Sequence, residues 1–383
     1  MTSAVASVVE PRKIRVGIIG ANPDRGWAVR AHLPALRALP QYEITAVGTS
    51  RPESARAAAR AFGAAHAFTD AARLAGHPDV DLVVVTVKVP AHTELVGAAL
   101  AAGKHVYCEW PLSRTTAEAQ ALAAAARGAG VHHVIGLQAR YAPALAHARE
   151  LVAGGSLGRI TSATVHAARG KGAGGLIPGW AAYTLDRANG AGTLEVAGGH
   201  TLDAVQHVLG GIEELTAVTS VSRSAYTVAE TGATVVATSP DRLRLDGTLL
   251  GGARLSATVQ DAEGVEAGTR LEITGTEGAL AVVSTGPAGP AGIQIGELRL
   301  LRADAPGGEF REVPLPDRYR MPGIGRDAEG FNVARLYARL ARDLRTGERG
   351  VPGFDEGVRV HRLLDAIGRS ADAGGVRQVP ARR

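Results

Sequence analysis

The chain of 383 residues has a single cysteine, few aromatic side chains and no long hydrophobic run. Because Cys108 has no second cysteine to pair with, the chain cannot form an internal disulfide, and we expect it in the reducing cytoplasm. No apolar stretch approaches the roughly 20 residues that a membrane helix requires. The segment 1–13 also lacks the apolar region of a secretory signal, so we expect a flexible tail there.

The excess of positive over negative charge is small as well. The formal net charge is +5, and the arginines are spread through Ala-rich segments. Aromatic residues make up 4% of the chain, which leaves few rings for stacking on bases. We therefore expect neither a nucleic-acid partner nor a membrane partner. The 45% hydrophobic content is sufficient for two domains, each with its own core.

The first third alternates apolar runs of strand length with Ala-rich helical stretches, a pattern typical of βαβ units. We expect strands at 14–19, 44–47, 82–87, 105–108 and 131–137, with helices at 27–39, 52–62, 91–102 and 115–128. The continuous apolar run at 82–87 is typical of a strand that is buried on both faces. This segment therefore predicts an α/β domain of the Rossmann type, with a doubly wound parallel sheet.

The pattern changes after residue 137, where a helix at 143–153 is followed by longer segments of alternating polarity. These lie at 160–167, 217–221, 233–238, 243–249, 253–259 and 270–274. They predict an α+β domain with a large open, mainly antiparallel sheet and helices on one face, and the Gly- and Pro-rich 285–293 predicts a loop. We expect a tail at 1–13, a dinucleotide-binding domain at 14–137 and a substrate and oligomerisation domain at 138–383.

A Gly-rich turn directly follows the first strand, with the sequence Gly20-Ala21-Asn22-Pro23-Asp24-Arg25-Gly26-Trp27. A phosphate cradle at this place needs small residues, a tight turn and free N–H groups at a helix start. Asn22 stands where the second glycine of the usual fingerprint is found, and asparagine tolerates a left-handed backbone comparatively well. We expect Gly20, Asn22, Arg25 and Trp27 to bind the cofactor, with Arg25 at its pyrophosphate. An ordinary turn is the alternative.

The end of the second strand, Gly48-Thr49-Ser50-Arg51, has no acidic residue to accept a hydrogen bond from a ribose 2′-hydroxyl. An arginine at this place favours a 2′-phosphate instead. We therefore expect Ser50 and Arg51 to contact NADP(H), with NAD(H) as the second choice. The alternative is a solvated arginine on an ordinary turn.

Several further segments carry a family resemblance. They are Val87-Lys88-Val89-Pro90-Ala91-His92, Glu109-Trp110-Pro111, Gly199-His200-Thr201-Leu202-Asp203, Gly275-Thr276-Glu277-Gly278 and Asn332-Val333-Ala334-Arg335. In their order and spacing, together with the Gly-rich turn, they resemble the Gfo/Idh/MocA oxidoreductases over nearly the whole chain. The resemblance is narrowest with the branch that contains the fungal galactose-pathway repressor.

The resemblance implies a substrate site between the Rossmann strand ends and the sheet of the second domain. Val87, His92, Glu109 and Trp110 are then expected at the cofactor, and Trp110 replaces the lysine of the family's Glu-Lys-Pro. A second family residue, an aspartate, is replaced by Val196. Two of the residues that usually carry out catalysis in the family are therefore absent from this chain.

Four polar residues are candidates for the missing chemistry. We hypothesise that Lys88, which stands where the family has proline, supplies the lost charge, although a solvated lysine is an equal alternative. His200 fits a general acid/base or a substrate contact, because imidazole exchanges protons near neutral pH. Its alternative is a hydrogen-bonded core histidine. Tyr183 and Asp186 are further candidates for acids or substrate contacts, with surface residues as the alternative.

His200, Asp203 and His207 share a helix face by their spacing, which raises the question of a metal site. We expect no metal, because no further ligand is evident in the sequence. Arg140, at the crossing between the domains, is expected to tie them together or to bind substrate.

These observations predict an NADP(H)-dependent oxidoreductase that transfers hydride to or from a sugar-like or polyol alcohol or carbonyl. Two alternatives stay open: a dinucleotide-binding sensor without turnover, and redox-neutral sugar chemistry with a bound cofactor. The resemblance further implies a homodimer or homotetramer assembled through the sheet of the second domain.

Overall fold

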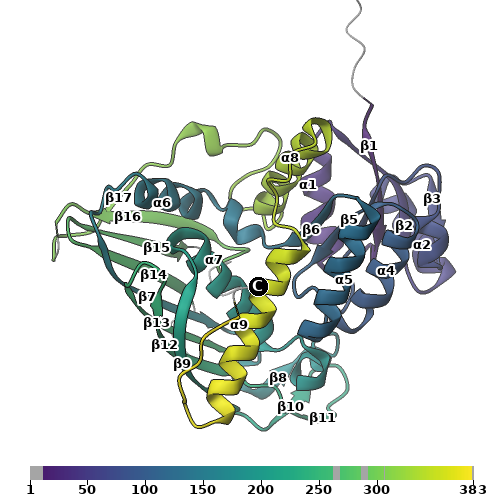
Figure 1. Cartoon of the computed structure of the whole chain (residues 1–383). Coiled ribbons are helices and arrows are strands. Elements are labelled where there is room, and N and C mark those ends of the chain that lie inside the picture. Colours follow the sequence, from purple (N-terminus) through teal and green to yellow (C-terminus); the bar gives the residue numbers. More distant parts are fainter. Residues whose placement is uncertain (1–11, 262–267, 286–291, 306, 382–383) are drawn as a thin grey trace, which may run out of the picture.

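The computed structural model describes residues 12–261, 268–285, 292–305 and 307–381. Two large sheets lie side by side, as Figure 1 shows. One has six strands in the order β3-β2-β1-β4-β5-β6, and the other has eight in the order β17-β16-β15-β14-β7-β13-β12-β9. Both sheets were predicted from the sequence and are confirmed. The expected tail lies almost wholly outside the described residues.

The six-stranded sheet is parallel throughout and forms the Rossmann domain. Its strands are β1 (Ile14–Ile19), β2 (Tyr42–Gly48), β3 (His66–Phe68), β4 (Leu82–Val85), β5 (His105–Glu109) and β6 (His133–Gly136). Its helices are a π-helical turn η1 (Ala28–His32), α1 (Leu33–Arg37), α2 (Pro52–Phe62), α3 (Ala71–Ala75), a 3-10 turn η2 (Val89–Ala91), α4 (His92–Ala101) and α5 (Thr116–Ala129). β4 is buried along its whole length, as its apolar sequence predicted, and ends earlier than expected because residues 86–88 turn into a cleft.

The second domain opens with the 3-10 turn η3 (Gln138–Tyr141) and α6 (Pro143–Ala153). Its large sheet consists of β7 (Ile160–Arg169), β9 (Ile212–Ser220), β12 (Arg242–Leu249), β13 (Arg254–Asp261), β14 (Gly268–Gly275), β15 (Ala279–Thr285), β16 (Glu297–Ala303) and β17 (Arg311–Glu312). Only the β7–β13 pair is parallel among these neighbours. Most of the predicted loop at 285–293 lies outside the described residues.

A third, small sheet in the order β11-β10-β8 lies beside the Rossmann domain (Figure 1). It consists of β8 (Leu176–Ile177), β10 (Ala225–Val228) and β11 (Thr234–Val236). Short helical turns join it to the remainder of the domain, namely η4 (Ala173–Gly175), η5 (Ala182–Leu185), η6 (Arg187–Asn189) and η7 (Leu194–Gly198), which continues into α7 (Gly199–Leu209). These turns and the small sheet bring polar residues of the second domain next to the Rossmann strand ends.

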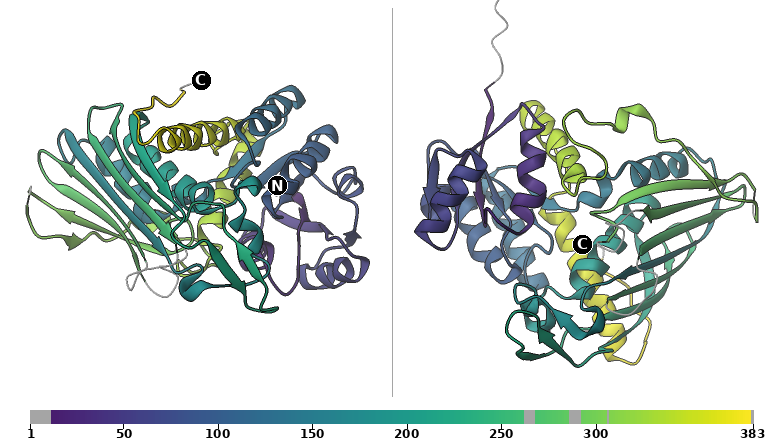
Figure 2. Two further views of the ribbon diagram at one scale, coloured as in Figure 1. Left: turned by 90° about the horizontal axis from the view of Figure 1, so that it is seen from below. Right: turned by 180° about the vertical axis from the view of Figure 1, so that it is seen from behind.

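The last two helices, α8 (Phe331–Thr346) and α9 (Phe354–Asp372), follow a short turn η9 (Asp317–Tyr319) and bring the chain back to the Rossmann domain. Tyr337 and Leu340 of α8 share a buried core with Val16 of β1 and Tyr42 of β2. Figure 2 shows α9 along the junction of the two large sheets, where it contacts α5, β6 and β9. The C-terminal segment thus packs on both domains, and the division at residue 137 stays a prediction. Within the described ranges, no helix is both long and apolar enough to span a membrane.

Candidate functional site

A cleft of about 1230 Å³ opens at the carboxyl edge of the Rossmann sheet. Its first wall consists of the loops that follow β1, β2, β3 and β4, and its second wall comes from the loop around Tyr183 and the end of β10. Between β1 and β4 the order of the strands reverses, and the crevice at such a point is where open parallel sheets bind ligands. The cleft is therefore the first candidate for a dinucleotide and its substrate.

Gly20 holds the sharp turn at the base of the cleft. Its φ is +94°, and a Cβ atom there would lie 2.8 Å from Thr86 Oγ1 and 2.9 Å from Val87 Cγ1. Both the backbone conformation and the close approach of the β4 loop therefore require glycine. Gly20 and Val87 both line the cleft, and their expected contact with the cofactor stays a prediction.

Asn22 shapes the turn through its side chain. Its Oδ1 accepts hydrogen bonds from the backbone N–H of Asp24 at 2.9 Å and of Arg25 at 3.1 Å, which is an Asx turn. The turn leads into the helix η1–α1, whose first N–H groups have no partner inside the helix. Arg25 and Trp27 line the cleft beside this helix start, and the buried indole N–H of Trp27 has no partner among the described residues.

The expected cofactor-selecting residues, Ser50 and Arg51, are exposed and line the cleft at the end of β2. Arg51 is also the residue before α2, with an extended backbone. Asp70, which was not predicted from the sequence, lines the same part of the cleft and caps α3 by accepting a hydrogen bond from Arg73 N at 3.0 Å. It was missed because β3, which places it there, is short and only partly buried.

Lys88 and Tyr183 meet across the cleft. Lys88 ends the loop after β4, and its Nζ lies 4.7 Å from the centre of the Tyr183 ring, which belongs to η5 of the second domain. Burial raises the pKa of Tyr183 above its ordinary value, so the phenol keeps its proton at neutral pH. A cation and a phenol thus stand together where the two walls of the cleft join.

His92 and Glu109 lie behind the cleft and do not line it. The two ring nitrogens of His92 are 3.0 Å from Val87 O and 2.8 Å from Pro111 O, so the ring links the β4 loop to the Glu-Trp-Pro segment. Burial lowers the pKa of His92, and a neutral ring donates to one carbonyl at a time. Glu109 Oε1 lies 3.0 Å from Nε2 of buried His32. Their expected direct contact with a cofactor stays a prediction.

Trp110 also lies outside the wall of the cleft, with 5% of its surface exposed. Its Nε1 donates a hydrogen bond to Glu195 O at 2.8 Å, and its ring lies 4.8 Å from the ring of His361 on α9. The residue at the position of the family's lysine is thus part of the packing between the domains.

His200 is buried on α7 and does not line the cleft. Burial, with a smaller effect from Arg169, lowers the pKa of His200 to about 3, and its Nδ1 has no partner among the described residues. The ring is therefore neutral near pH 7, and its expected role as a general acid/base or substrate contact stays a prediction. Asp186 is exposed and caps η6 by accepting a hydrogen bond from Ala188 N at 3.0 Å, away from the cleft.

The residues weighed for a metal site do not converge. Asp203 instead accepts a bidentate pair of hydrogen bonds from Arg140, at 2.9 and 2.6 Å, which ties α7 to η3. Both elements belong to the second domain, so this pair does not join the two domains, and the expected role of Arg140 in tying them or binding substrate stays a prediction. In the described part of the chain, the single group whose ligand atoms lie close enough together for a metal ion is His66, His77 and Asp79. His66 begins β3, an edge strand of the Rossmann sheet. Asp79 is already paired with Arg15 at 2.7 Å.

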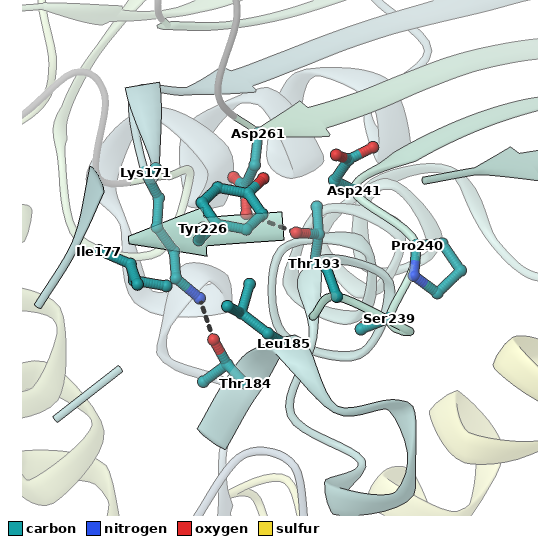
Figure 3. Close-up of a pocket in the computed structure, with 12 residues that line it drawn as sticks. Lys171, Ile177, Thr184, Leu185, Thr193, Tyr226, Ser239, Pro240, Asp241 and Asp261 are labelled. Atoms are coloured by element: carbon teal, nitrogen blue, oxygen red, sulfur yellow. Dashed lines mark hydrogen bonds between the residues drawn. The ribbon is translucent and has the colours of Figure 1, made fainter. Parts of the chain in front are cut away.

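Figure 3 shows a second, small cavity at the inner end of β7 and β13. Lys171 Nζ donates to Thr184 Oγ1 at 2.7 Å, and Thr193 Oγ1 donates to Asp261 (Figure 3). Burial lowers the pKa of Lys171 to about 8. With a volume of about 20 Å³, the cavity has room for a single water molecule and none for a sugar. Lys171 was not predicted as a site residue, because nothing in its local sequence distinguishes it from a solvated lysine.

The large cleft fits a dinucleotide. Gly20 lets the backbone approach closely, the helix start and the indole N–H of Trp27 offer donors, and Arg25 and Arg51 supply positive charge at two places. Of the expected site residues, those that line the cleft are Gly20, Asn22, Arg25, Trp27, Ser50, Arg51, Val87, Lys88 and Tyr183.

Comparison with known proteins assigns the two domains separately. Residues 14–137 match the Gfo/Idh/MocA model, described as an oxidoreductase family with an NAD-binding Rossmann fold, and residues 143–284 match the C-terminal domain of Gal80p. The dehydrogenase aclE of Aspergillus oryzae is 40% identical over 225 residues, which cover 55% of this chain and 58% of that protein. The D-glucoside 3-dehydrogenase of Escherichia coli is 35% identical over 206 residues, covering 53% and 56%.

The matches to these two curated relatives thus span little more than half of their own lengths. A crystal structure of a super-repressor mutant of Gal80p from Saccharomyces cerevisiae superimposes with a TM-score of 0.83 at 25% identity. That match covers 96% of this chain and 98% of Gal80p. With its two family models, its fold and its cleft, the chain belongs to the Gfo/Idh/MocA oxidoreductase family and combines a nicotinamide-dinucleotide-binding Rossmann domain with a second domain of the Gal80p type.

Proposed function

We propose that the chain is an NADP(H)-dependent oxidoreductase that acts on a sugar-like or polyol alcohol or carbonyl. The observation that carries the proposal is the contact of Lys88 with Tyr183, at 4.7 Å, in the wall of a cleft built for a dinucleotide. This pair supplies a cation and a proton donor. Trp110, which stands at the position of the family's lysine, is instead buried in the packing between the domains. The dehydrogenases among its relatives, one of them named for a glucoside, support the substrate class.

In this proposal, a bound nicotinamide supplies or accepts the hydride. Tyr183 holds a proton at its phenol because burial raises its pKa, so it serves as the general acid when a carbonyl is reduced. Lys88 stabilises the negative charge that develops on the substrate oxygen, since an ammonium group is aimed at this place from the opposite wall. Trp180, which is 56% exposed and lines the same cleft, offers an apolar surface to the face of a sugar ring.

The preference for NADP(H) rests on Arg51 and Ser50 at the end of β2, where an acid would favour the free 2′-hydroxyl of NAD(H). Asp70 at the next strand end opposes this preference in part. Its carboxylate accepts a hydrogen bond from Arg73 N, so part of its charge is already compensated by α3.

A second candidate is a dinucleotide-binding regulator without turnover. It is favoured by the burial of Trp110 and His200 and by the likeness to Gal80p over 96% of the chain. For either function we propose a homodimer or homotetramer that uses the outer face of the eight-stranded sheet, where Thr164, His166 and Arg270 are exposed. Light scattering after size-exclusion chromatography measures this assembly directly.

The deciding experiment follows the absorbance of reduced nicotinamide with NADP and NAD against aldoses, polyols, glycosides and their oxidised forms. We expect turnover with NADP, and a fall in kcat of roughly 10²- to 10⁴-fold in Lys88→Met and in Tyr183→Phe. Lys13→Met, at an exposed residue away from the cleft, is the control. Binding of NADP without turnover of any compound would favour the regulator, and product formation without net change of the cofactor would favour redox-neutral chemistry.

A further inference from the structure

A second open pocket, of about 350 Å³, lies at the junction of the two domains on the α9 side. We call it the junction pocket. Its walls come from the start of α5, from the turns η6 and η7 and from the last half of α9. Its lining shares no residue with that of the dinucleotide cleft. Pockets of a few hundred Å³ between domains are common places for small ligands.

The floor of the junction pocket holds polar atoms that the protein itself does not satisfy. His361 lines the pocket and is 5% exposed, and its Nε2 has no partner among the described residues. The same is true of the buried Oγ1 of Thr116, the first residue of α5. A buried polar atom without a partner is costly, so two of them in residues that line one pocket are consistent with a ligand that supplies the missing hydrogen bonds.

The start of α5 adds backbone donors. Thr115 caps this helix of 14 residues, and its Oγ1 accepts only the N–H of Glu118, at 3.2 Å. The N–H groups of Thr116 and Ala117, the first two helical residues, have no partner inside the helix. Burial lowers the pKa of His361 to about 4, so the ring is neutral at physiological pH and can carry a hydrogen on Nε2. The floor of the pocket is therefore rich in donors.

Three arginines line the pocket with these donors: Arg114 in the loop before α5, Arg187 on η6 and Arg369 on α9. Arg114 is already held by Glu118 at 2.7 Å, whereas Arg187 approaches Asp372 only to 3.8 Å. Arg369 has no carboxylate partner in the part of the chain that the structure describes, and its Nε reaches the amide of Gln378 at 3.4 Å. Three acids line the pocket too. Asp365 and Asp372 of α9 are both exposed. Glu195 of η7 is partly buried, its Oε2 accepts a hydrogen bond from Gly192 N at 3.0 Å, and burial raises its pKa, which favours the uncharged form.

We propose that the junction pocket binds a small phosphate-bearing molecule. The buried donors and the helix start hold the phosphoryl oxygens, and Arg187 and Arg369 neutralise their charge. Trp110 couples this pocket to the family's catalytic position, because its ring contacts His361 and its Nε1 donates to the backbone of Glu195, which lines the pocket. The ligand is thus an effector that acts through Trp110, independently of which function the cleft performs.

The test uses inorganic phosphate and glycerol phosphate in isothermal titration calorimetry of the full chain. We expect both to bind, and the double variant Arg187→Gln/Arg369→Gln to weaken binding by roughly tenfold or more. Thr116→Val, which removes one buried hydroxyl and keeps the shape, is expected to weaken binding without disturbing the fold. The matched control is Arg25→Gln/Arg51→Gln, which changes two arginines of the dinucleotide cleft and should leave phosphate binding at the junction intact.

Fluorescence provides an independent measurement, because the chain has three tryptophans and two of them line the cleft. In the variant Trp27→Phe/Trp180→Phe, Trp110 is the one tryptophan left, and we expect phosphate to change its emission. The proposal is overturned if phosphate gives no binding, or if the cleft variant loses it while the Arg187/Arg369 variant keeps it. Neither measurement depends on turnover, so its failure leaves the proposed oxidoreductase untouched.

Discussion

The indole of Trp110 lies directly against the backbone of Gly199 at the start of α7. A Cβ atom on Gly199 would be 2.5 Å from Trp110 Nε1 and 2.7 Å from Cε2. The large ring at the position of the family's lysine thus fits because its neighbour has no side chain. Loss of the lysine leaves no hole in this protein, since the indole occupies the space and donates its hydrogen bond to Glu195 O.

This contact predicts that Gly199→Ala destabilises the protein by about 1–3 kcal/mol, because the new methyl group overpacks the indole. The matched control is Gly97→Ala in α4, where a Cβ would meet nothing within 4 Å. The control should be neutral or slightly stabilising, because alanine is the better helix former. Urea unfolding followed by circular dichroism measures both, and equal stability of the two variants would contradict the overpacking.

In the turn after β1, we expect alanine to have a larger effect at Gly20 than at Gly26. Gly20→Ala should cost about 1–3 kcal/mol of backbone strain and weaken dinucleotide binding at least tenfold, because its Cβ would also push on Thr86 and Val87. Gly26→Ala, with a φ of +95° but open space around it, brings the strain without the clash. Calorimetric titration with NADP should therefore show a larger loss for Gly20→Ala, and a smaller one would refute the role of the β4 loop.

We expect Arg51 to set the preference for NADP over NAD. Arg51→Gln should weaken NADP binding by roughly ten- to a hundredfold, because a charge-assisted bond to the 2′-phosphate is lost, and should leave NAD binding nearly unchanged. Arg56→Gln, at an exposed position on the same helix α2, is the control. The ratio of the two dissociation constants is the quantity to measure, and a ratio that does not move would favour the solvated-arginine reading.

His200 predicts how stability depends on pH. Burial lowers its folded pKa from 6.5 to about 3, so the unfolded chain binds the extra proton between these values. The contribution of the neutral His200 ring to the free energy of unfolding is therefore fully present above about pH 6.5. It is lost as the pH falls from 6.5 towards 3.

His200→Gln should therefore reduce the slope of unfolding free energy against pH by about 1.4 kcal/mol per pH unit in this window. Unfolding curves at a series of pH values measure the slope, with His166→Gln at an exposed position of β7 as the comparison. An unchanged slope in His200→Gln would show that the ring is accessible to protons in the folded state.

Much of the fold was predictable because the signals are local. The strand Ile14–Ile19 and the helices Pro52–Phe62 and Pro143–Ala153 have the predicted bounds, since an apolar run or a proline at the helix start marks each of them. The short β3 carries no such mark, because its three residues are partly exposed.

The sequence by itself determined the side of the cleft that we assign to the dinucleotide. Gly20, Asn22 and Arg51 lie directly after strand ends, and parallel strands bring their carboxyl ends to one edge, so sequence order alone places such residues together. Which polar residues complete the site was decided by tertiary structure, because burial depends on elements far apart in the chain. The second domain brings Tyr183 to Lys88, whereas packing around α7 encloses His200 and makes its charged form too costly at neutral pH.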